Sequence, residues 1–203
     1  AGIPRGRGPG LDVERGDPAA RHAGDRGERA ADVEPWTIER QRVHGAVAGF
    51  GLSLVNACDL VVAADDAYFA SAYRQIALSP DGGGSWSLPR LVGTRKAMEI
   101  LLLGERFGAA EAHALGLVNR VVPAVQLDAA TEAVVQALAA GPVGALRRTR
   151  RLVRDATART LSEQLQAEAL SFGACAGTPD FDEGITAFLE KRKPRWLAEF
   201  EAE

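Results

Sequence analysis

A glycine-rich turn at residues 45–51 restricts the fold of this 203-residue chain more than any other feature. Apolar Leu52 and Val55 follow it directly, and their spacing predicts a helix over 52–58. A run rich in β-branched residues then predicts a short buried strand at 59–64. A turn, a helix and a strand in such quick succession favour a layered α/β domain.

The remainder of the chain continues this alternation and ends in a helical tail. A second extended stretch is predicted at 67–70, and a further strand at 118–122 is stopped by Pro123. Proline and glycine make 78–84 a loop. The fold class is therefore α/β. Helices are predicted over 85–92, 94–103, 109–115, 127–140, 143–156, 161–176 and 180–190.

Composition changes near residue 43. Residues 1–43 are rich in Arg, Gly, Asp, Glu and Pro, and their apolar positions follow no period, so we predict a disordered or loosely packed segment with a short helix over 35–42. Its arginines suggest an RNA-binding arm, but interleaved acidic residues dilute any attraction for phosphate. We predict a core over 44–140 and a helical region over 141–203.

Overall composition excludes several classes of protein. The formal net charge is −3, which gives no basic balance for nucleic acid. No Cys/His spacing is typical of a metal site, and two isolated cysteines favour a reducing cytoplasm. No apolar run reaches the roughly 20 residues of a membrane span, and the first residues show no signal-peptide pattern.

Several ordered blocks share one register from His44 to Pro194, which a helix-rich core alone does not explain. The blocks are HGAVAGFG (44–51), ACDLVVAA (57–64), LPRLVG (88–93), LGERFGAAEA (103–112), GLVNRVVP (116–123) and DEGITAFLEKRKP (182–194). They resemble the crotonase (enoyl-CoA hydratase/isomerase) superfamily, and most closely its epoxyphenylacetyl-CoA and delta-3,delta-2-enoyl-CoA isomerases.

The resemblance implies a spiral of ββα units with a C-terminal helical trimerisation region. It implies an enzyme acting on an acyl-CoA thioester through a stabilised enolate. Coenzyme A is then part of the substrate, and no separate cofactor or metal is expected. The resemblance also implies a homo-oligomer, a trimer or hexamer. From its composition we expect this protein to be cytoplasmic, with neither membrane nor nucleic acid as partner.

The glycine turn is the first candidate element of a catalytic site. Free backbone N–H groups at a helix start favour anions and can stabilise a developing oxyanion. By resemblance, the Phe50 N–H occupies the position of the second oxyanion donor, with Gly49 and Gly51 beside the substrate. The alternative is a tight packing turn without a ligand.

The carboxylates that follow decide which reaction is favoured. The family's hydratases activate a water with two glutamates, and Ser53 and Tyr73 stand at those positions. Neither is an efficient base near neutral pH. Asp81, in PDGGGSW (80–86), stands where the isomerases carry an acid, and burial beside an apolar acyl group would strengthen its acid/base role. We predict an isomerase with one carboxylate as proton shuttle; the alternatives are an enoyl-CoA hydratase and, for Asp81, a turn residue between Pro and Gly.

Other residues are predicted to bind the substrate. Tyr73, Gly83 and Trp86 are candidates for the acyl pocket, although such aromatics also occur in cores and interfaces. Phe188 and Lys191 match a C-terminal helix that contacts coenzyme A, and Lys191 alternatively belongs to a solvated charge run. A basic run at 147–151 is interpreted as a solvated helix face.

The segment before His44 departs from the family. No Ala-Gly-x-Asp-type loop, the source of the first oxyanion donor, precedes Gly45, and no family-like strand leads into the turn. We interpret residues 1 to about 43 as a truncated or out-of-frame remnant, with the N-terminal strands missing. A catalytically impaired protein is therefore a third alternative.

Overall fold

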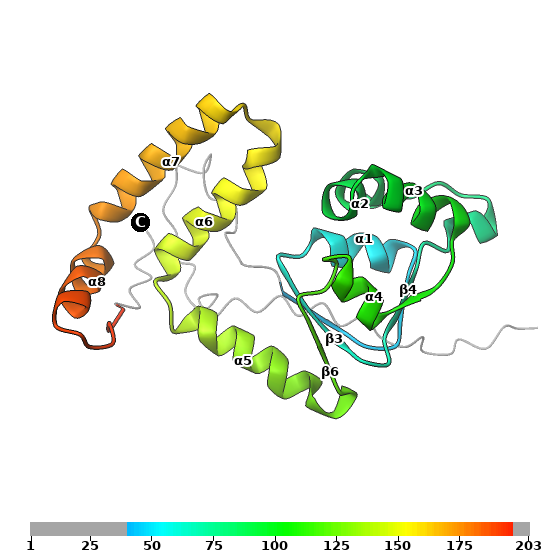
Figure 1. Cartoon of the computed structure of the whole chain (residues 1–203), viewed down its shortest axis with the longest axis horizontal. Helices are drawn as coiled ribbons and strands as arrows, with labels where there is room; N and C mark the ends of the chain where they lie inside the picture. Colours follow the sequence, from blue (N-terminus) through cyan, green and yellow to red (C-terminus); the bar gives the residue numbers. More distant parts are fainter. Residues whose placement is uncertain (1–39, 197–203) are drawn as a thin grey trace, which may run out of the picture. The chain divides into compact units, whose positions relative to one another are not determined.

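The computed structural model describes residues 40–196, and these form two compact units, 40–132 and 133–196. The first unit contains every strand of the described region and helices α1 to α4, and the second is helical (Figure 1). Helix α5 (Leu127–Ala139) spans the boundary. The predicted boundaries at 43/44 and 140/141 thus differ from the structural one, and residues 1–39 of the predicted loose segment lie outside the described residues.

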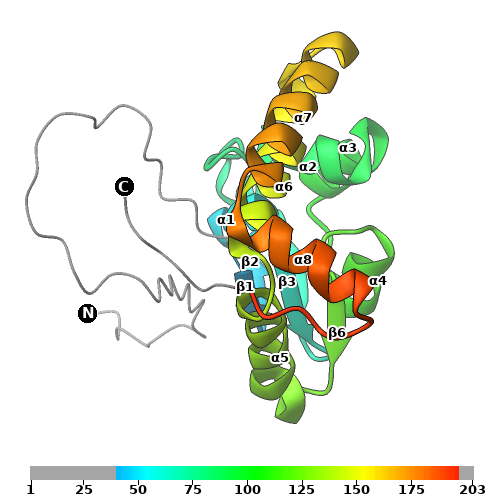
Figure 2. The ribbon, with the colours of Figure 1, turned by 90° about the vertical axis from the view of Figure 1, so that its left-hand side faces the viewer.

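The first sheet is parallel, in the order β1-β3-β6. Strand β1 (Arg40–Val43) pairs with β3 (Leu60–Ala64), and β3 pairs with β6 (Arg120–Val122). Figure 2 shows β1 beside β3. Strand β6 begins two residues later than predicted. At Asn119 the side-chain oxygen, instead of a backbone carbonyl, accepts the hydrogen bond from the Val61 N–H of β3, at 2.7 Å.

Strand β1 corrects the prediction of a helix over 35–42. Gln41 and Val43 are each only 1% exposed, and the intervening Arg42 is partly exposed, which is the alternation of a half-buried strand. The alternation of buried and exposed positions was not apparent in the sequence, because the buried Gln41 is polar and Arg40 and Arg42 flank it. Pairing with β3 satisfies the backbone, so this part of the segment predicted as loose belongs to the sheet.

The second sheet has the order β2-β4-β5. Strand β2 (Ala46–Ala48) runs parallel to β4 (Tyr68–Ala70), and β4 is antiparallel to the two-residue β5 (Phe107–Gly108), which was not predicted. Each of β1 and β3 is thus followed by a strand in the other sheet and then by helices, so the chain winds through successive ββα units.

The helices of the first unit pack on one another beside these strands (Figure 1). They agree with the predicted segments to within one residue, except that α1 starts two residues earlier. The short helix η1 (Tyr73–Ile76) was not predicted. The helices are α1 (Phe50–Ala57), α2 (Gly84–Val92), α3 (Thr94–Leu103) and α4 (Ala109–Ala114), and the turn η2 (Ala124–Gln126) precedes α5.

One hydrophobic core fills the first unit. Val47, Phe69 and Leu88 are fully buried, and the Phe69 ring stacks on Phe107 with centroids 5.6 Å apart. Complete burial of such side chains contributes about 1.5–3 kcal/mol each relative to exposure. This core holds the starts of α1 and α2 in place, because both helices contribute side chains to it.

The sequence predicted three helices of the second unit to within one residue at each end. They are α6 (Val143–Asp155), α7 (Leu161–Ala176) and α8 (Pro179–Leu189). The short turn η3 (Ala156–Ala158) was not predicted. Local signals begin α7 and α8: Thr160 and Glu163 form a capping box, and Thr178 caps α8 with Pro179 in its first turn.

Candidate active site

The start of α1 presents free backbone donors. Gly49 adopts φ 56°, a left-handed conformation that favours glycine, and its N–H donates to the Ala70 carbonyl at 3.1 Å. Among residues 40–196, the Phe50 and Gly51 N–H groups have no hydrogen-bond acceptor. The first turn of α1 holds no acidic residue, so the positive end of the helix dipole is uncompensated within it. This arrangement suits an oxyanion at Phe50.

The loop before α2 lies against this helix start because it is made of glycine. A Cβ on Gly82 would lie 2.7 Å from the Phe50 ring, and one on Gly84 would lie 2.4 Å from the Ser53 hydroxyl. Gly83, predicted to bind substrate, is the residue before α2, with φ 79°, and a Cβ there would meet nothing within 4 Å. The glycine run thus brings Asp81 to α1.

Asp81 is hydrogen-bonded by two side chains from other elements. The Tyr73 hydroxyl donates to its Oδ1 at 2.6 Å, and the Ser53 hydroxyl donates to its backbone carbonyl at 2.9 Å. The two hydroxyl oxygens are 3.4 Å apart. Burial, and then the bond to Asp81, raise the pKa of the Tyr73 phenol above its ordinary value, so it remains a donor at neutral pH.

The structure places Asp81 and Trp86 at the surface. Asp81 is exposed in the described chain, since glycines and Pro80 surround it in a surface loop. Trp86 is 57% exposed, and the Arg90 guanidinium lies 3.9 Å from the centre of its ring in a cation–π pair. The predicted roles of both residues toward the acyl group stay predictions.

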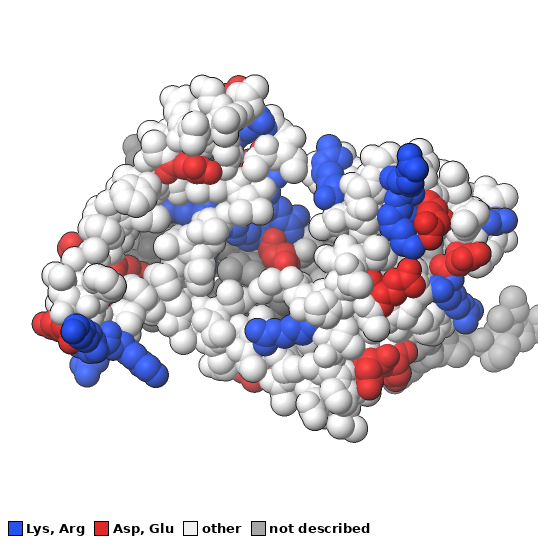
Figure 3. All heavy atoms as spheres, in the orientation of Figure 1, with Lys and Arg blue, Asp and Glu red and all other residues white. Residues whose placement is uncertain are grey.

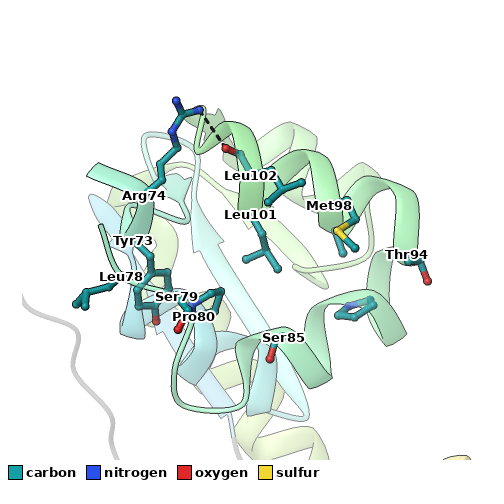
Figure 4. Close-up of a pocket in the computed structure, with 12 residues that line it drawn as sticks. Tyr73, Arg74, Leu78, Ser79, Pro80, Ser85, Thr94, Met98, Leu101 and Leu102 are labelled. Atoms are coloured by element: carbon teal, nitrogen blue, oxygen red, sulfur yellow. Dashed lines mark hydrogen bonds between the residues drawn. The ribbon is translucent and has the colours of Figure 1, made fainter. Parts of the chain in front are cut away.

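An apolar cavity of about 400 Å³ adjoins Tyr73 (Figure 4). Tyr73, Leu78 and Pro80 form one wall, and Met98, Leu101 and Leu102 of α3 form the opposite one. Arg74 joins the two sides at the rim, because its guanidinium donates to the Leu102 and Leu103 carbonyls at 3.0 and 2.7 Å. Tyr73 therefore lines this cavity and contacts Asp81 as well, and its predicted contact with the acyl group stays a prediction.

Phe188 and Lys191 belong to the second unit. Phe188 is 80% exposed at the end of α8, and its carbonyl accepts from the Lys191 N–H at 3.2 Å. Lys191 has φ 54°, an uncommon conformation for a residue with a side chain. The predicted contacts of both residues with coenzyme A stay predictions.

Charged side chains of both signs are interspersed on the face shown in Figure 3. In α6, Arg148 and Arg151 of the basic run at 147–151 are exposed, as the solvated-face interpretation predicted, whereas Arg147 and Arg150 are partly buried. Arg151 approaches Asp155 at 3.7 Å. Within residues 40–196 no group of three or more His, Cys, Asp or Glu side chains is arranged to hold a metal ion. In the same range no single helix is long and apolar enough to cross a membrane; one pair of consecutive helical segments passes that test only when taken together.

Comparison with known proteins agrees with this fold. The family model for enoyl-CoA hydratase/isomerase matches residues 37–199. A probable enoyl-CoA hydratase of Rhodobacter capsulatus is 41% identical over 154 residues, covering 76% of this chain and 60% of that protein. The 1,2-epoxyphenylacetyl-CoA isomerase of Escherichia coli is 35% identical over 154 residues, covering 76% of this chain and 59% of that protein.

Solved structures show the same fold. Enoyl-CoA hydratase subunit I of Geobacillus kaustophilus superposes with a TM-score of 0.79 at 37% identity, covering 81% of this chain and 64% of that one. An enoyl-CoA hydratase of a Polaromonas species gives a TM-score of 0.75 at 42% identity, covering 78% of this chain and 62% of that one.

The fold is therefore the crotonase-like α/β fold, and the chain belongs to the enoyl-CoA hydratase/isomerase family of the crotonase superfamily. It spans about 60% of the length of the curated relatives that it matches. The match reaches back to residue 37 and so includes β1, which lies before the predicted start of the family region at His44.

Proposed function

We propose that the protein is an acyl-CoA double-bond isomerase that uses Asp81 as a single proton shuttle and the Phe50 N–H as an oxyanion donor. One observation carries this proposal: the loop that bears Asp81 lies on the start of α1, through the 2.9 Å bond from Ser53 to the Asp81 carbonyl. The loop that bears the carboxylate thus packs against the helix whose first N–H groups are free, which supports a shared site.

The proposed reaction follows from these two groups. The Phe50 N–H binds the thioester oxygen, and negative charge developing there is stabilised by about 3 kcal/mol per donor. Asp81 removes a proton from one carbon of the acyl group and returns it two bonds along the conjugated system. No bound water takes part, which agrees with hydroxyl residues at Ser53 and Tyr73, the two positions where a hydratase needs carboxylates.

The apolar cavity beside Tyr73 supports an acyl substrate. Its walls are largely side chains without charge, and a thioester carrying an aliphatic or aromatic acyl group would bury its apolar part there. The similarity to an epoxyphenylacetyl-CoA isomerase favours isomerisation. The names of other relatives favour hydration of an enoyl-CoA, which we retain as the second candidate.

The test compares carboxylate variants on a 3-enoyl-CoA substrate. We expect Asp81→Asn to lower kcat by about 10²- to 10⁴-fold, because it removes the base. Asp66→Asn, which changes an exposed carboxylate in the turn between β3 and β4, serves as the matched control and should keep the wild-type rate. Crotonyl-CoA hydration is measured in parallel.

The outcomes separate the candidates. Equal rates for Asp81→Asn and Asp66→Asn would refute a catalytic role for Asp81. Hydration without isomerisation would establish the second candidate instead. A folded wild-type chain that does neither would support the third alternative, a family member whose catalysis is impaired.

We further propose a cytoplasmic homo-oligomer that uses no cofactor beyond the coenzyme A of its substrate. Large apolar side chains on α7 and α8 support association, because they are exposed in the single chain. Sedimentation equilibrium should give a trimer or a hexamer; a monomer throughout the micromolar range would refute the assembly. The exposed residues are Leu161, Leu165, Leu170, Phe172, Phe181, Ile185, Phe188 and Leu189.

A further inference from the structure

Asp81 is exposed and lies in a glycine-rich loop, yet it is held at two points. Tyr73 of η1 donates to its carboxylate, and Ser53 of α1 donates to its backbone carbonyl. Both donors are buried, with 8% and 2% of their surfaces exposed, so core packing fixes their positions. A loop carboxylate thereby becomes part of a rigid framework.

The two oxygens of the carboxylate are not equivalent in this framework. Oδ1 accepts the Tyr73 hydroxyl at 2.6 Å, a short distance typical of a bond to an ionised acceptor. Within the described residues Oδ2 has no hydrogen-bond donor. Only Oδ2 therefore keeps its full capacity to take up a proton.

We propose that Tyr73 is a positioning residue that engages Oδ1 of Asp81, so that Oδ2 is the atom that carries the proton between the two carbons of the acyl group. The inference rests on the proposed isomerase function and adds to it the atom that moves the proton and the residue that orients that atom.

The proton transfer balances without another reactant. A C–H bond of the acyl group breaks, its proton forms an O–H bond with Oδ2, and the electron pair moves into the conjugated thioester. The same O–H bond then breaks as the proton joins the second carbon and the double bond shifts. Tyr73 keeps its own proton throughout, in agreement with its raised pKa.

No charged side chain of the elements next to Asp81 is a partner of its carboxylate in place of Tyr73. Helix α1 carries no charged residue. Arg74 of η1 donates to the Leu102 and Leu103 carbonyls, and Arg90, the one charged residue of α2, lies over Trp86. Tyr73 is thus the polar group that defines the surroundings of the carboxylate.

The chain offers a matched pair for the kinetic test, because its two tyrosines are Tyr68 and Tyr73. Tyr68, on β4, lies under the Arg106 guanidinium at 4.9 Å. Tyr73→Phe should lower kcat for the 3-enoyl-CoA by about 10- to 100-fold with KM little changed, since the ring stays and only orientation is lost. Tyr68→Phe should behave as wild type.

The split between kcat and KM separates positioning from a merely structural effect. A lost orientation of the carboxylate lowers kcat, whereas a damaged pocket wall raises KM. No loss of kcat in Tyr73→Phe, or an equal loss in Tyr68→Phe, would overturn the inference.

An optical titration tests the hydrogen bond independently of activity. In Tyr68→Phe, Tyr73 is the one tyrosine left, and tyrosinate absorbance reports its ionisation. Adding Asp81→Asn should lower the pKa of Tyr73, because a carboxylate next to the phenol opposes its ionisation. An unchanged titration in folded protein, checked by circular dichroism, would overturn the inference. An inactive wild type would instead refute the proposed function, and the proton-carrying role with it.

Discussion

The two units of the chain differ in what stabilises them. Residues 40–132 bury valine, leucine and phenylalanine side chains between strands and helices, and their active-site groups rest on that core. In the described part of the second unit, residues 133–196, Val134 and Ala187 are the buried apolar residues, whereas nine larger apolar side chains are exposed. Helices α7 and α8 begin at local side-chain caps, so short-range signals count for more in the second unit and long-range packing for more in the first.

A Phe→Ala substitution in each unit gives the strongest test of the difference in packing between the two units. Phe69→Ala should lower the free energy of unfolding by about 3–5 kcal/mol, because the ring is fully buried against Phe107. Phe172→Ala on α7, where the side chain is 72% exposed, should cost less than about 0.5 kcal/mol. Urea unfolding of the dilute, dissociated chain measures both.

The proposed self-association of the chain provides a second test at Phe172. In concentrated solution Phe172→Ala should weaken the oligomer, whereas a conservative Phe172→Leu should largely preserve it. Equal losses from Phe69→Ala and Phe172→Ala in the dissociated chain would contradict the difference between the two units.

Two glycines make a second matched pair. Gly84→Ala should destabilise the first unit by about 1–3 kcal/mol, because the added Cβ meets the Ser53 hydroxyl and drives the Asp81 loop off α1. Gly144→Ala in α6 meets nothing within 4 Å and should stabilise by about 0.5–1 kcal/mol through its better helix propensity. Thermal unfolding compares them, and changes of the same sign would be contrary to expectation.

A helix cap provides a smaller effect confined to the second unit. Thr160→Ala removes the side chain that accepts the Glu163 N–H and should cost about 1 kcal/mol, with a loss of helix signal in circular dichroism. Thr157→Ala, which changes an exposed residue of η3, is the control. If both variants lose the same stability, the cap is not what starts α7.

The smallest expected effect is a dependence on pH at the end of α8. The Arg192 guanidinium, and then the Arg195 N–H, lower the pKa of Glu183 from 4.5 to about 2. Because the pKa of Glu183 is lower in the folded state, its ionised carboxylate stabilises that state fully above pH 4.5. This stabilisation is lost as the pH falls toward about 2. Glu183→Gln should flatten this part of the stability curve. Glu105→Gln, at an exposed site of the first unit, should leave it unchanged.

Much of the fold was predictable because its signals are local. In the second unit α7 and α8 begin at side-chain caps, and the ends of α6, α7 and α8 agree with prediction to within one residue. Strand β1 was not predictable in that way. Its Gln41 is buried through a partner strand about 20 residues further along the chain, and its charged neighbours resemble a solvated segment.

For the candidate site, too, the residue types were predictable from the sequence and the tertiary contacts were not. The glycine turn, the choice of Asp81 as the acid and the absence of carboxylates at Ser53 and Tyr73 were all visible in the residues. The exposure of Asp81 and the pairing of Trp86 with Arg90 were not, because both depend on how the loop packs on α1.

The sequence by itself determined the family and the types of group available for chemistry, because motifs and residue types are properties of the chain. Only the tertiary structure decided that Tyr73 and Ser53 hold Asp81. Parallel pairing of β2 with β4 places Gly49 beside Ser71, and η1 follows at once, so α1 and Tyr73 meet. Side chains 8 and 28 residues from Asp81 come within hydrogen-bonding distance through that pairing, which no local pattern encodes.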